Sequence, residues 1–159
     1  MIIGVVSDTH LTGSNHFLEM VIEKYFKDVA LVLHAGDLIS LDVLHAFKGK
    51  EVRAVSGNSD PPEVKQRLPI KEVITADHFK IGLIHGWGFP VGLGKRVEAS
   101  FDEIDCIVYG HSHWATNYYR NGILHFNPGS FLGGISSLWR PSIGLLTVDK
   151  KIRGEIIRL

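Results

Sequence analysis

Strand-length apolar runs that alternate with helical patterns in the first sixty residues constrain the fold of this chain most strongly. Residues 2–8 and 30–37 have the composition of buried strands, and residues 15–27 between them have apolar side chains at helical spacing. A second helical pattern at 40–47 precedes a third strand pattern at 51–57. Alternation of this kind predicts parallel strands flanked by helices.

The pattern changes after Pro61 and Pro62, where strands begin to follow one another through short turns. Asn121-Gly122 favours the positive backbone angles of a tight hairpin. Five further strands and one helix are predicted: strands at 71–77, 79–86, 105–111, 142–149 and 154–159, and a helix at 94–101; residues 116–127 form the hairpin. This layout predicts an α/β sandwich of two sheets.

Length and charge limit the class of protein. A chain of 159 residues fits one domain, which we expect to span residues 1–159. Basic and acidic side chains number 17 each, so there is no strong nucleic-acid signal. The chain begins with a strand pattern, and no apolar stretch reaches membrane-spanning length, so we expect a cytoplasmic protein without membrane association. Cys106, the single cysteine, is expected to be a core thiol.

Polar side chains stand where the apolar runs end, in the segments "SDTH", "HAGD", "SGNSD", "LIHG" and "YGHSH". Open α/β sheets bind ligands at the carboxyl ends of their strands. Carboxylate, amide and imidazole groups together suit hard or intermediate divalent cations. The candidate ligands are Asp8, His10, Asp37, Asn58, His85, His111 and His113.

The size of this ligand set suits two ions better than one. A structural zinc site needs only four ligands and commonly includes thiolates, which are absent from the set. A carboxylate such as Asp37 could bridge two ions that together hold the attacking and leaving oxygens of a phosphoryl transfer. If the backbone stays extended, Asp8 and His10 lie on one side of the chain, as do His111 and His113.

The ordered motifs "DTH", "GD", "GN", "HG" and "GHSH" resemble those of the calcineurin-like metallophosphoesterase superfamily. The chain length and the segments "HAGD", "FKIGLIHG" and "NPGS" narrow the resemblance to the small YfcE-like phosphodiesterases and the related retromer scaffold subunit. The resemblance covers essentially the whole chain. It implies a four-layer αββα sandwich of two mixed β-sheets flanked by helices.

The resemblance also implies a reaction and a cofactor. A hydroxide activated by two divalent metal ions would attack phosphorus in line with the leaving group of a small phosphate ester, with nucleotide-derived esters among the candidates. Manganese is the expected metal, with nickel, iron, cobalt and zinc as alternatives. By position, one ion would be held by Asp8, His10, Asp37 and His113, and the other by Asp37, Asn58, His85 and His111.

Three residues are predicted to have catalytic roles. Asn58 and His111 would position the phosphate, and Asp60 would orient a ligand or water, unless it is a turn carboxylate. Ser59 stands where many superfamily members have a histidine near the leaving group. A hydroxyl is a poor general acid, so we expect aryl esters to react better than esters with basic alkoxide leaving groups.

Trp87 replaces a polar group that follows the "HG" motif in related small members. The loop "WGFPVGLG" that it begins would stack on a nucleobase or aromatic leaving group, or would form a hydrophobic cover or an oligomer contact.

Histidines outside the ligand set have several expected roles. His34 is expected to be a satisfied buried histidine, and His125 would support the site or supply a proton. His16, His45 and His78 are expected at the surface.

Two other classes of function compete with an enzyme. The first is a noncatalytic protein-binding scaffold, for which Leu132, Ile135, Leu138 and Trp139 would supply an apolar partner surface or the contact of a homodimer or larger homo-oligomer. The second is a flavodoxin-like nucleotide-binding domain. That reading lacks a glycine-rich phosphate loop after the first strand, where "SDTHLTG" stands.

Overall fold

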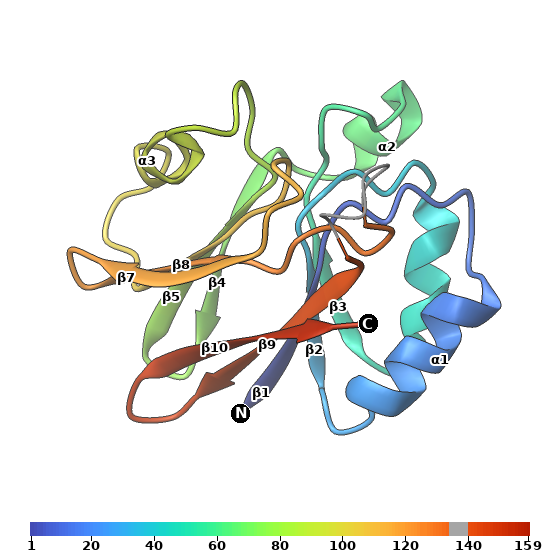
Figure 1. Ribbon diagram of the computed structural model, residues 1–159, viewed down its shortest axis with the longest axis horizontal. Coiled ribbons are helices and arrows are strands. Elements are labelled where there is room, and N and C mark those ends of the chain that lie inside the picture. Colours follow the sequence, from blue (N-terminus) through green and yellow to red (C-terminus); the bar gives the residue numbers. More distant parts are fainter. Residues whose placement is uncertain (134–139) are drawn as a thin grey trace.

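The computed structural model of the protein describes residues 1–133 and 140–159, which contain two five-stranded sheets (Figure 1). The first sheet contains β1 (Ile2–Val6), β2 (Leu31–His34), β3 (Glu51–Ala54), β9 (Ser142–Val148) and β10 (Ile152–Arg158). The second contains β4 (Lys71–Ala76), β5 (Phe79–Ile84), β6 (Cys106–Val108), β7 (Thr116–Arg120) and β8 (Ile123–Asn127). Their orders are β10-β9-β1-β2-β3 and β4-β5-β6-β8-β7.

Both sheets are mixed, and each has three adjacent parallel strands. In the first sheet these are β1, β2 and β3, with β9 and β10 added antiparallel. In the second they are β5, β6 and β8, with β4 and β7 antiparallel at the two edges. The parallel strands matter for function because the loops that follow them carry the candidate ligands.

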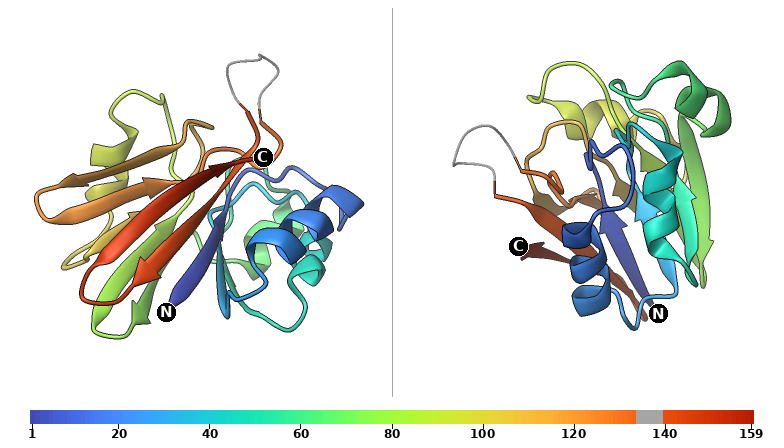
Figure 2. Two further views of the ribbon diagram at one scale, coloured as in Figure 1. Left: turned by 60° about the horizontal axis from the view of Figure 1, so that its bottom comes forward. Right: turned by 90° about the vertical axis from the view of Figure 1, so that its right-hand side faces the viewer.

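The two sheets pack face to face, and helices cover their outer faces (Figures 1 and 2). The helices are α1 (His16–Tyr25), the 3₁₀ helix η1 (Leu41–Phe47), α2 (Pro62–Arg67) and α3 (Leu93–Glu98). The core between the sheets includes Val5, Leu33, Leu83 and Phe126. α1 and η1 bury Leu18 and Phe47 against the first sheet, and α3 buries Leu93 and Val97 against the second. The predicted four-layer αββα sandwich is therefore confirmed.

Burial on both faces explains the sequences of the central strands. Every residue of β2 is buried, as are the last four residues of β1. A strand covered on both faces has an uninterrupted apolar sequence instead of an alternating one. Cys106 is also fully buried in this core, and burial raises the pKa of its thiol, so the predicted core role is confirmed.

Two helical elements differ from the sequence prediction. α2 was not predicted; Pro62 occupies its first helical position, where a missing N–H costs nothing. The predicted helix at 40–47 is a 3₁₀ helix, although Ser40 caps it by accepting a hydrogen bond from Asp42 N at 3.1 Å. The six residues of α2 are too few for a periodic pattern to identify it.

The predicted apolar partner surface falls largely outside the described residues. Leu132 is described and 44% exposed, whereas Ile135, Leu138 and Trp139 lie outside the described ranges. A homodimer or larger homo-oligomer stays a prediction. Within residues 1–133 and 140–159, no helix has the length and apolar character needed to cross a membrane.

Asn15→Ala should lower the free energy of unfolding by about 1 kcal/mol, measured by urea denaturation. Asn15 Oδ1 accepts a hydrogen bond from Leu18 N at 2.9 Å and so satisfies a backbone donor at the start of α1. Asn15→Ser keeps an oxygen acceptor and should lose much less stability. Equal losses in the two variants would contradict the capping role.

Candidate metal centre

The candidate ligands come from loops at the carboxyl ends of the parallel strands. Asp8 and His10 follow β1, Asp37 follows β2 and Asn58 follows β3; His85 follows β5, and His111 and His113 follow β6. The loops after β1 and β2 run side by side, with hydrogen bonds of 3.0 Å from Asp8 N to Gly36 O and from His10 N to Asp37 O. Two sheets thus contribute to one site.

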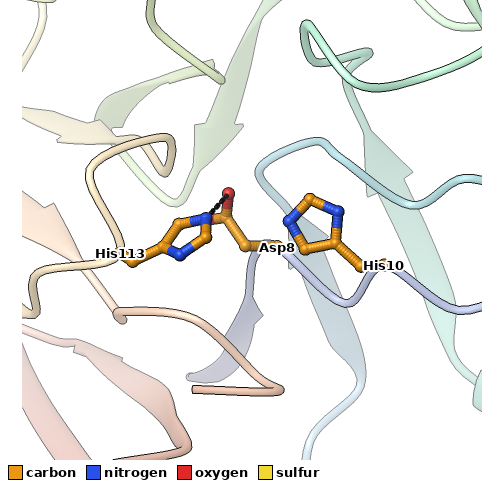
Figure 3. Close-up of side chains that lie close together, drawn as sticks. All are labelled: Asp8, His10 and His113. Atoms are coloured by element: carbon orange, nitrogen blue, oxygen red, sulfur yellow. Dashed lines mark ion pairs between the residues drawn. The ribbon is translucent and has the colours of Figure 1, made fainter. Parts of the chain in front are cut away.

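Asp8, His10 and His113 form a first group of side chains that could hold a metal ion. One ligand atom from each lies within 4.8 Å of the others. Figure 3 shows His10 and His113 on opposite sides of Asp8. Nε2 of His113 is 3.2 Å from Oδ1 of Asp8, so an imidazole from the second sheet meets a carboxylate from the first.

Asp8, Asp37 and His85 form a second group under the same distance limit, and all three are buried. Nε2 of His85 lies 3.4 Å from Oδ2 of Asp37 and 4.0 Å from Oδ1 of Asp8. Oδ2 of Asp37 is also 3.8 Å from Nε2 of His10. Asp8 is therefore common to both groups, and Asp37 approaches a histidine of each; the bridging role of Asp37 stays a prediction.

Buried polar atoms in this centre indicate that the residues fit a divalent cation. Nδ1 of His85 donates to Ala35 O at 2.6 Å, which leaves the lone pair of Nε2 directed toward the carboxylates. Among the described residues, Nε2 of His85 and Oδ1 of Asp8 are buried without a well-formed hydrogen bond. An ion that accepts electron pairs from both atoms would offset the cost of their burial.

The carboxylate of Asp37 is stabilised in its charged form. Burial would raise the pKa of Asp37, but contact with His85 and two donors of Ser59 hold it below its usual range. For the imidazole of His85 burial acts in the opposite direction and would lower the pKa, but Asp37 and Asp8 raise it above its usual value. Negative charge and imidazole are thus concentrated where a cation would lie.

His111 and Asn58 approach each other at the open side of the centre. Nδ1 of His111 is 2.8 Å from Oδ1 of Asn58, and its Nε2 is 2.7 Å from Gly88 O. Both partners are acceptors, and a neutral imidazole donates from only one nitrogen. If Nε2 donates to Gly88 O, Nδ1 of His111 and Oδ1 of Asn58 face each other as two acceptors, and both would suit the binding of a cation.

The backbone at the ligands is not extended, although an extended form was assumed for the pair Asp8 and His10 and for the pair His111 and His113. That assumption is wrong: five candidate ligands have positive φ angles, which non-glycine residues rarely adopt. They are Asp8 (53°), His10 (46°), Asp37 (56°), His111 (66°) and His113 (58°). The side chains converge through tight turns, and strained backbone of this kind gathers at functional sites.

Two glycines let the loops approach closely enough to form the centre. A Cβ at Gly57 would lie 2.8 Å from Cδ2 of His85 and would collide with the carboxylate of Asp37. A Cβ at Gly110 would lie 2.8 Å from Oδ2 of Asp8 and would collide with Ser7 Oγ. Neither position has room for a side chain.

Asp60 is buried next to the candidate ligand Asp37 and is 2% exposed. Its carboxylate accepts hydrogen bonds from Asp37 N at 3.1 Å, Gly57 N at 2.7 Å and Ile39 N at 2.7 Å. These bonds tie the loop after β2 to the loop after β3. These contacts are those of a turn carboxylate, and they also orient the loop that carries the candidate ligand Asp37.

Sequence reasoning missed two further supports of the ligands. Ser59 donates to both oxygens of Asp37, from N to Oδ1 and from Oγ to Oδ2, each at 2.8 Å. Ser7 Oγ donates to Oδ2 of Asp8 at 2.6 Å. Both serines adjoin a motif residue in the sequence, and that adjacency is the only signal that could have identified them.

Comparison with known proteins identifies the family. The model of the calcineurin-like phosphoesterase superfamily domain matches residues 1–151. The chain belongs to this superfamily. A probable metallophosphoesterase of Methanothermobacter thermautotrophicus is 33% identical to it over 162 residues, which cover 99% of this chain and 92% of that protein.

Solved structures agree with this membership of the superfamily. The structure of an archaeal phosphodiesterase has a TM-score of 0.78 and 27% sequence identity, with full coverage of both chains. Wild-type Vps29 of Entamoeba histolytica, complexed with Zn²⁺, has a TM-score of 0.71 and 26% identity, with 99% of each chain covered. This member of the calcineurin-like superfamily is thus similar to a phosphodiesterase and to Vps29.

The "NPGS" turn of this superfamily member supports the centre from the second sheet. Asn127 Nδ2 donates to Gly110 O at 2.8 Å, and Ser130 Oγ donates to Asp8 O at 3.1 Å. His125 does not reach the site through this turn: it is fully buried, stacks on Tyr118 and lies 3.2 Å from Glu98 Oε2. The predicted surface positions of His16, His45 and His78 are confirmed.

His34→Gln should reduce the loss of stability that acid causes in chelator-treated protein. His34 is fully buried between Thr9 Oγ1, 3.0 Å from Nε2, and Gly36 N, which donates to Nδ1 at 3.3 Å. Burial lowers its pKa from 6.5 to about 3, so only the unfolded chain binds a proton there between those values. Stability therefore falls as pH drops below 6.5, by up to about 1.4 kcal/mol per pH unit.

Urea unfolding of both proteins from pH 7.5 to 4.5 measures this effect. The difference in stability between wild type and His34→Gln should move in favour of the variant as the pH falls. A difference that does not change with pH would show that His34 becomes protonated in the folded protein.

Proposed function

We propose that the chain is a divalent-metal-dependent phosphodiesterase, with one catalytic domain spanning residues 1–159. The observation that carries this proposal is the pair of overlapping ligand groups, Asp8 with His10 and His113, and Asp8 with Asp37 and His85. Two ions, manganese by preference and otherwise nickel, iron, cobalt or zinc, suit a mixed set of imidazoles and carboxylates. The cytoplasm stays the predicted location.

The protein's own residues would hold and orient the phosphate ester. When bound, the ions would lower the pKa of a water for in-line attack on phosphorus and neutralise charge on the phosphate. Asn58 and His111 lie on the open side of the centre, so their side chains are placed to hold the phosphate in line. Asp60 would act as a positioning residue through Asp37 and Gly57.

The position of Ser59 predicts which esters react. Its hydroxyl donates to Asp37 Oδ2, so it is not free to protonate a leaving oxygen. Esters with aryl leaving groups need little help from an acid, and they should therefore react faster than alkyl esters.

Hydrolysis of a matched aryl phosphodiester and aryl phosphomonoester by chelator-stripped protein tests the proposal directly. We expect manganese-dependent cleavage of both or of the diester alone, with kcat/KM higher for the diester. No hydrolysis of either ester by protein with measured manganese binding would refute the enzyme assignment. Faster cleavage of the monoester would leave a phosphoesterase but reject the diesterase assignment.

A noncatalytic scaffold is the second candidate function, and the similarity to Vps29 favours it. Apolar side chains near the centre are exposed, among them Trp87, Phe89 and Val91, and could meet a partner protein. The retained ligand set argues for the enzyme. Metal loading without hydrolysis would place the scaffold first.

A further inference from the structure

A pocket of about 390 Å³ opens directly beside the candidate metal centre. Asn58 and His85, both candidate ligands, form part of its wall. Its volume lies in the range of roughly 300 to 1,000 Å³ that is usual for small-molecule sites. A molecule bound at the metal centre would therefore extend into this pocket without any movement of the chain.

The surface of the pocket is mostly apolar. Ile84 forms its buried side, and Ile70 and Trp87 stand at its opening, 76% and 49% exposed. A ligand that covers these exposed apolar side chains removes them from water, and this burial stabilises the complex. A ring placed against the indole of Trp87 would add stacking to this gain.

Within the described part of the chain, the pocket offers one cationic side chain to a second anionic group, and the rest of its lining is apolar, small or part of the metal centre. Lys65 is the one lysine or arginine among the described residues that line it. Its Nζ donates to Asn58 O at 2.8 Å, so it braces the loop after β3. An additional phosphate in this mostly apolar space would lose hydration and would gain only the ammonium of Lys65 in return, whereas an uncharged arm would lose none.

Arg96 holds the loop that carries Trp87. Its guanidinium donates to Trp87 O at 3.2 Å, to Val91 O at 3.0 Å and to Phe89 O. Gly88 O in the same loop also contacts His111 at the centre. The backbone that carries Trp87 is therefore held before a ligand binds, which lowers the entropic cost of ordering the loop on binding.

We propose that this pocket receives an uncharged aromatic or apolar arm of a phosphodiester, and that Trp87 selects substrates that carry such an arm. The inference rests on the proposed function, because it takes the phosphate to lie at the metal centre. A phosphomonoester has no second arm to fill the pocket while its leaving group departs. The pocket would thus favour diesters over monoesters.

Two p-nitrophenyl diesters with the same leaving group but different second arms test the role of Trp87. Methyl p-nitrophenyl phosphate has almost no arm, whereas phenyl p-nitrophenyl phosphate has an aromatic ring. For Trp87→Ala the ratio of kcat/KM, phenyl over methyl, should fall on the order of 10-fold from the wild-type ratio. Comparing ratios cancels the different intrinsic reactivities of the two esters.

Trp114→Ala is the matched control. The exposed fraction of Trp114, 52%, is similar to that of Trp87, but Trp114 lines a different pocket together with Tyr109 and Tyr118. Its loss should leave the phenyl-to-methyl ratio at the wild-type value, and Trp87→Phe, which retains a ring, should recover much of the ratio. An unchanged ratio in Trp87→Ala, or an equal fall in Trp114→Ala, would overturn the assignment.

Calorimetric titration of the manganese-loaded protein with diphenyl phosphate and dimethyl phosphate separates this inference from the proposed function. Diphenyl phosphate should bind more tightly, and Trp87→Ala should reduce that preference. If neither p-nitrophenyl ester is hydrolysed by wild type, the proposed function fails, and the titration still decides the pocket. Equal affinities for the two phosphates would overturn the pocket assignment even in an active enzyme.

Discussion

Asp37→Asn is expected to reduce manganese binding and to lower kcat/KM for an aryl phosphodiester by more than about 100-fold. Removing a residue that merely supports a metal ligand already lowers metal affinity or activity by about 10- to 100-fold. Asp37 is buried, and its oxygens lie near His10 and His85. Asparagine keeps the shape and one oxygen but removes the negative charge that balances an ion. Metal content after dialysis and steady-state kinetics measure the two effects.

Asp42→Asn is a suitable control for the loss of one negative charge. The side chain of Asp42 is 70% exposed, and its charged contact is with His45 on η1 and not with a candidate ligand. This variant should keep wild-type metal content and activity. Near-normal metal binding and turnover in Asp37→Asn would reject the bridging assignment for Asp37.

Gly57→Ala is expected to weaken manganese binding by about 10- to 100-fold without removing any ligand atom. The new methyl group would occupy space now filled by the carboxylate of Asp37 and would lie 2.6 Å from Asp37 N. The loops after β2 and β3 must separate to admit it, and overpacking of this kind costs typically about 1 to 3 kcal/mol of stability. Manganese titration and urea unfolding of the same preparation separate the two losses.

Gly13→Ala controls for the addition of a methyl group to a loop glycine. The nearest atom to a Cβ at Gly13 is Asp42 Cβ at 4.0 Å, an ordinary contact distance. This variant should retain wild-type metal affinity. If Gly57→Ala also retained it, the close approach of Gly57 to Asp37 would have no part in shaping the centre.

Much of the fold could be predicted from the sequence because burial leaves a clear local pattern. The covered strands β1 and β2 have uninterrupted apolar sequences, and Asn121-Gly122 marks the hairpin between β7 and β8. The helix α2 could not be predicted, because its six residues hold one buried side chain, Val64. A single apolar residue carries no periodicity.

The candidate site could be predicted in the types of its side chains and much less so in its geometry. Order and spacing identified the polar residues at the strand ends, but not the left-handed turns that aim them. The hydrogen bonds of Asp60 to Asp37 and Ile39 span more than twenty residues, so no local sequence pattern indicates them. The orientation of His85 likewise depends on Ala35 O, fifty residues away in the chain.

The positive φ angles at five candidate ligands lower the stability of the ion-free protein, and ion binding would add stability to the folded chain. Each such residue costs about 1 to 3 kcal/mol of backbone strain, which the rest of the fold must offset when no ion is bound. An ion that binds only the folded chain shifts the unfolding equilibrium in proportion to the logarithm of its free concentration. The melting temperature of this protein should therefore rise with free manganese, so that a calorimeter would detect ion occupancy without any substrate.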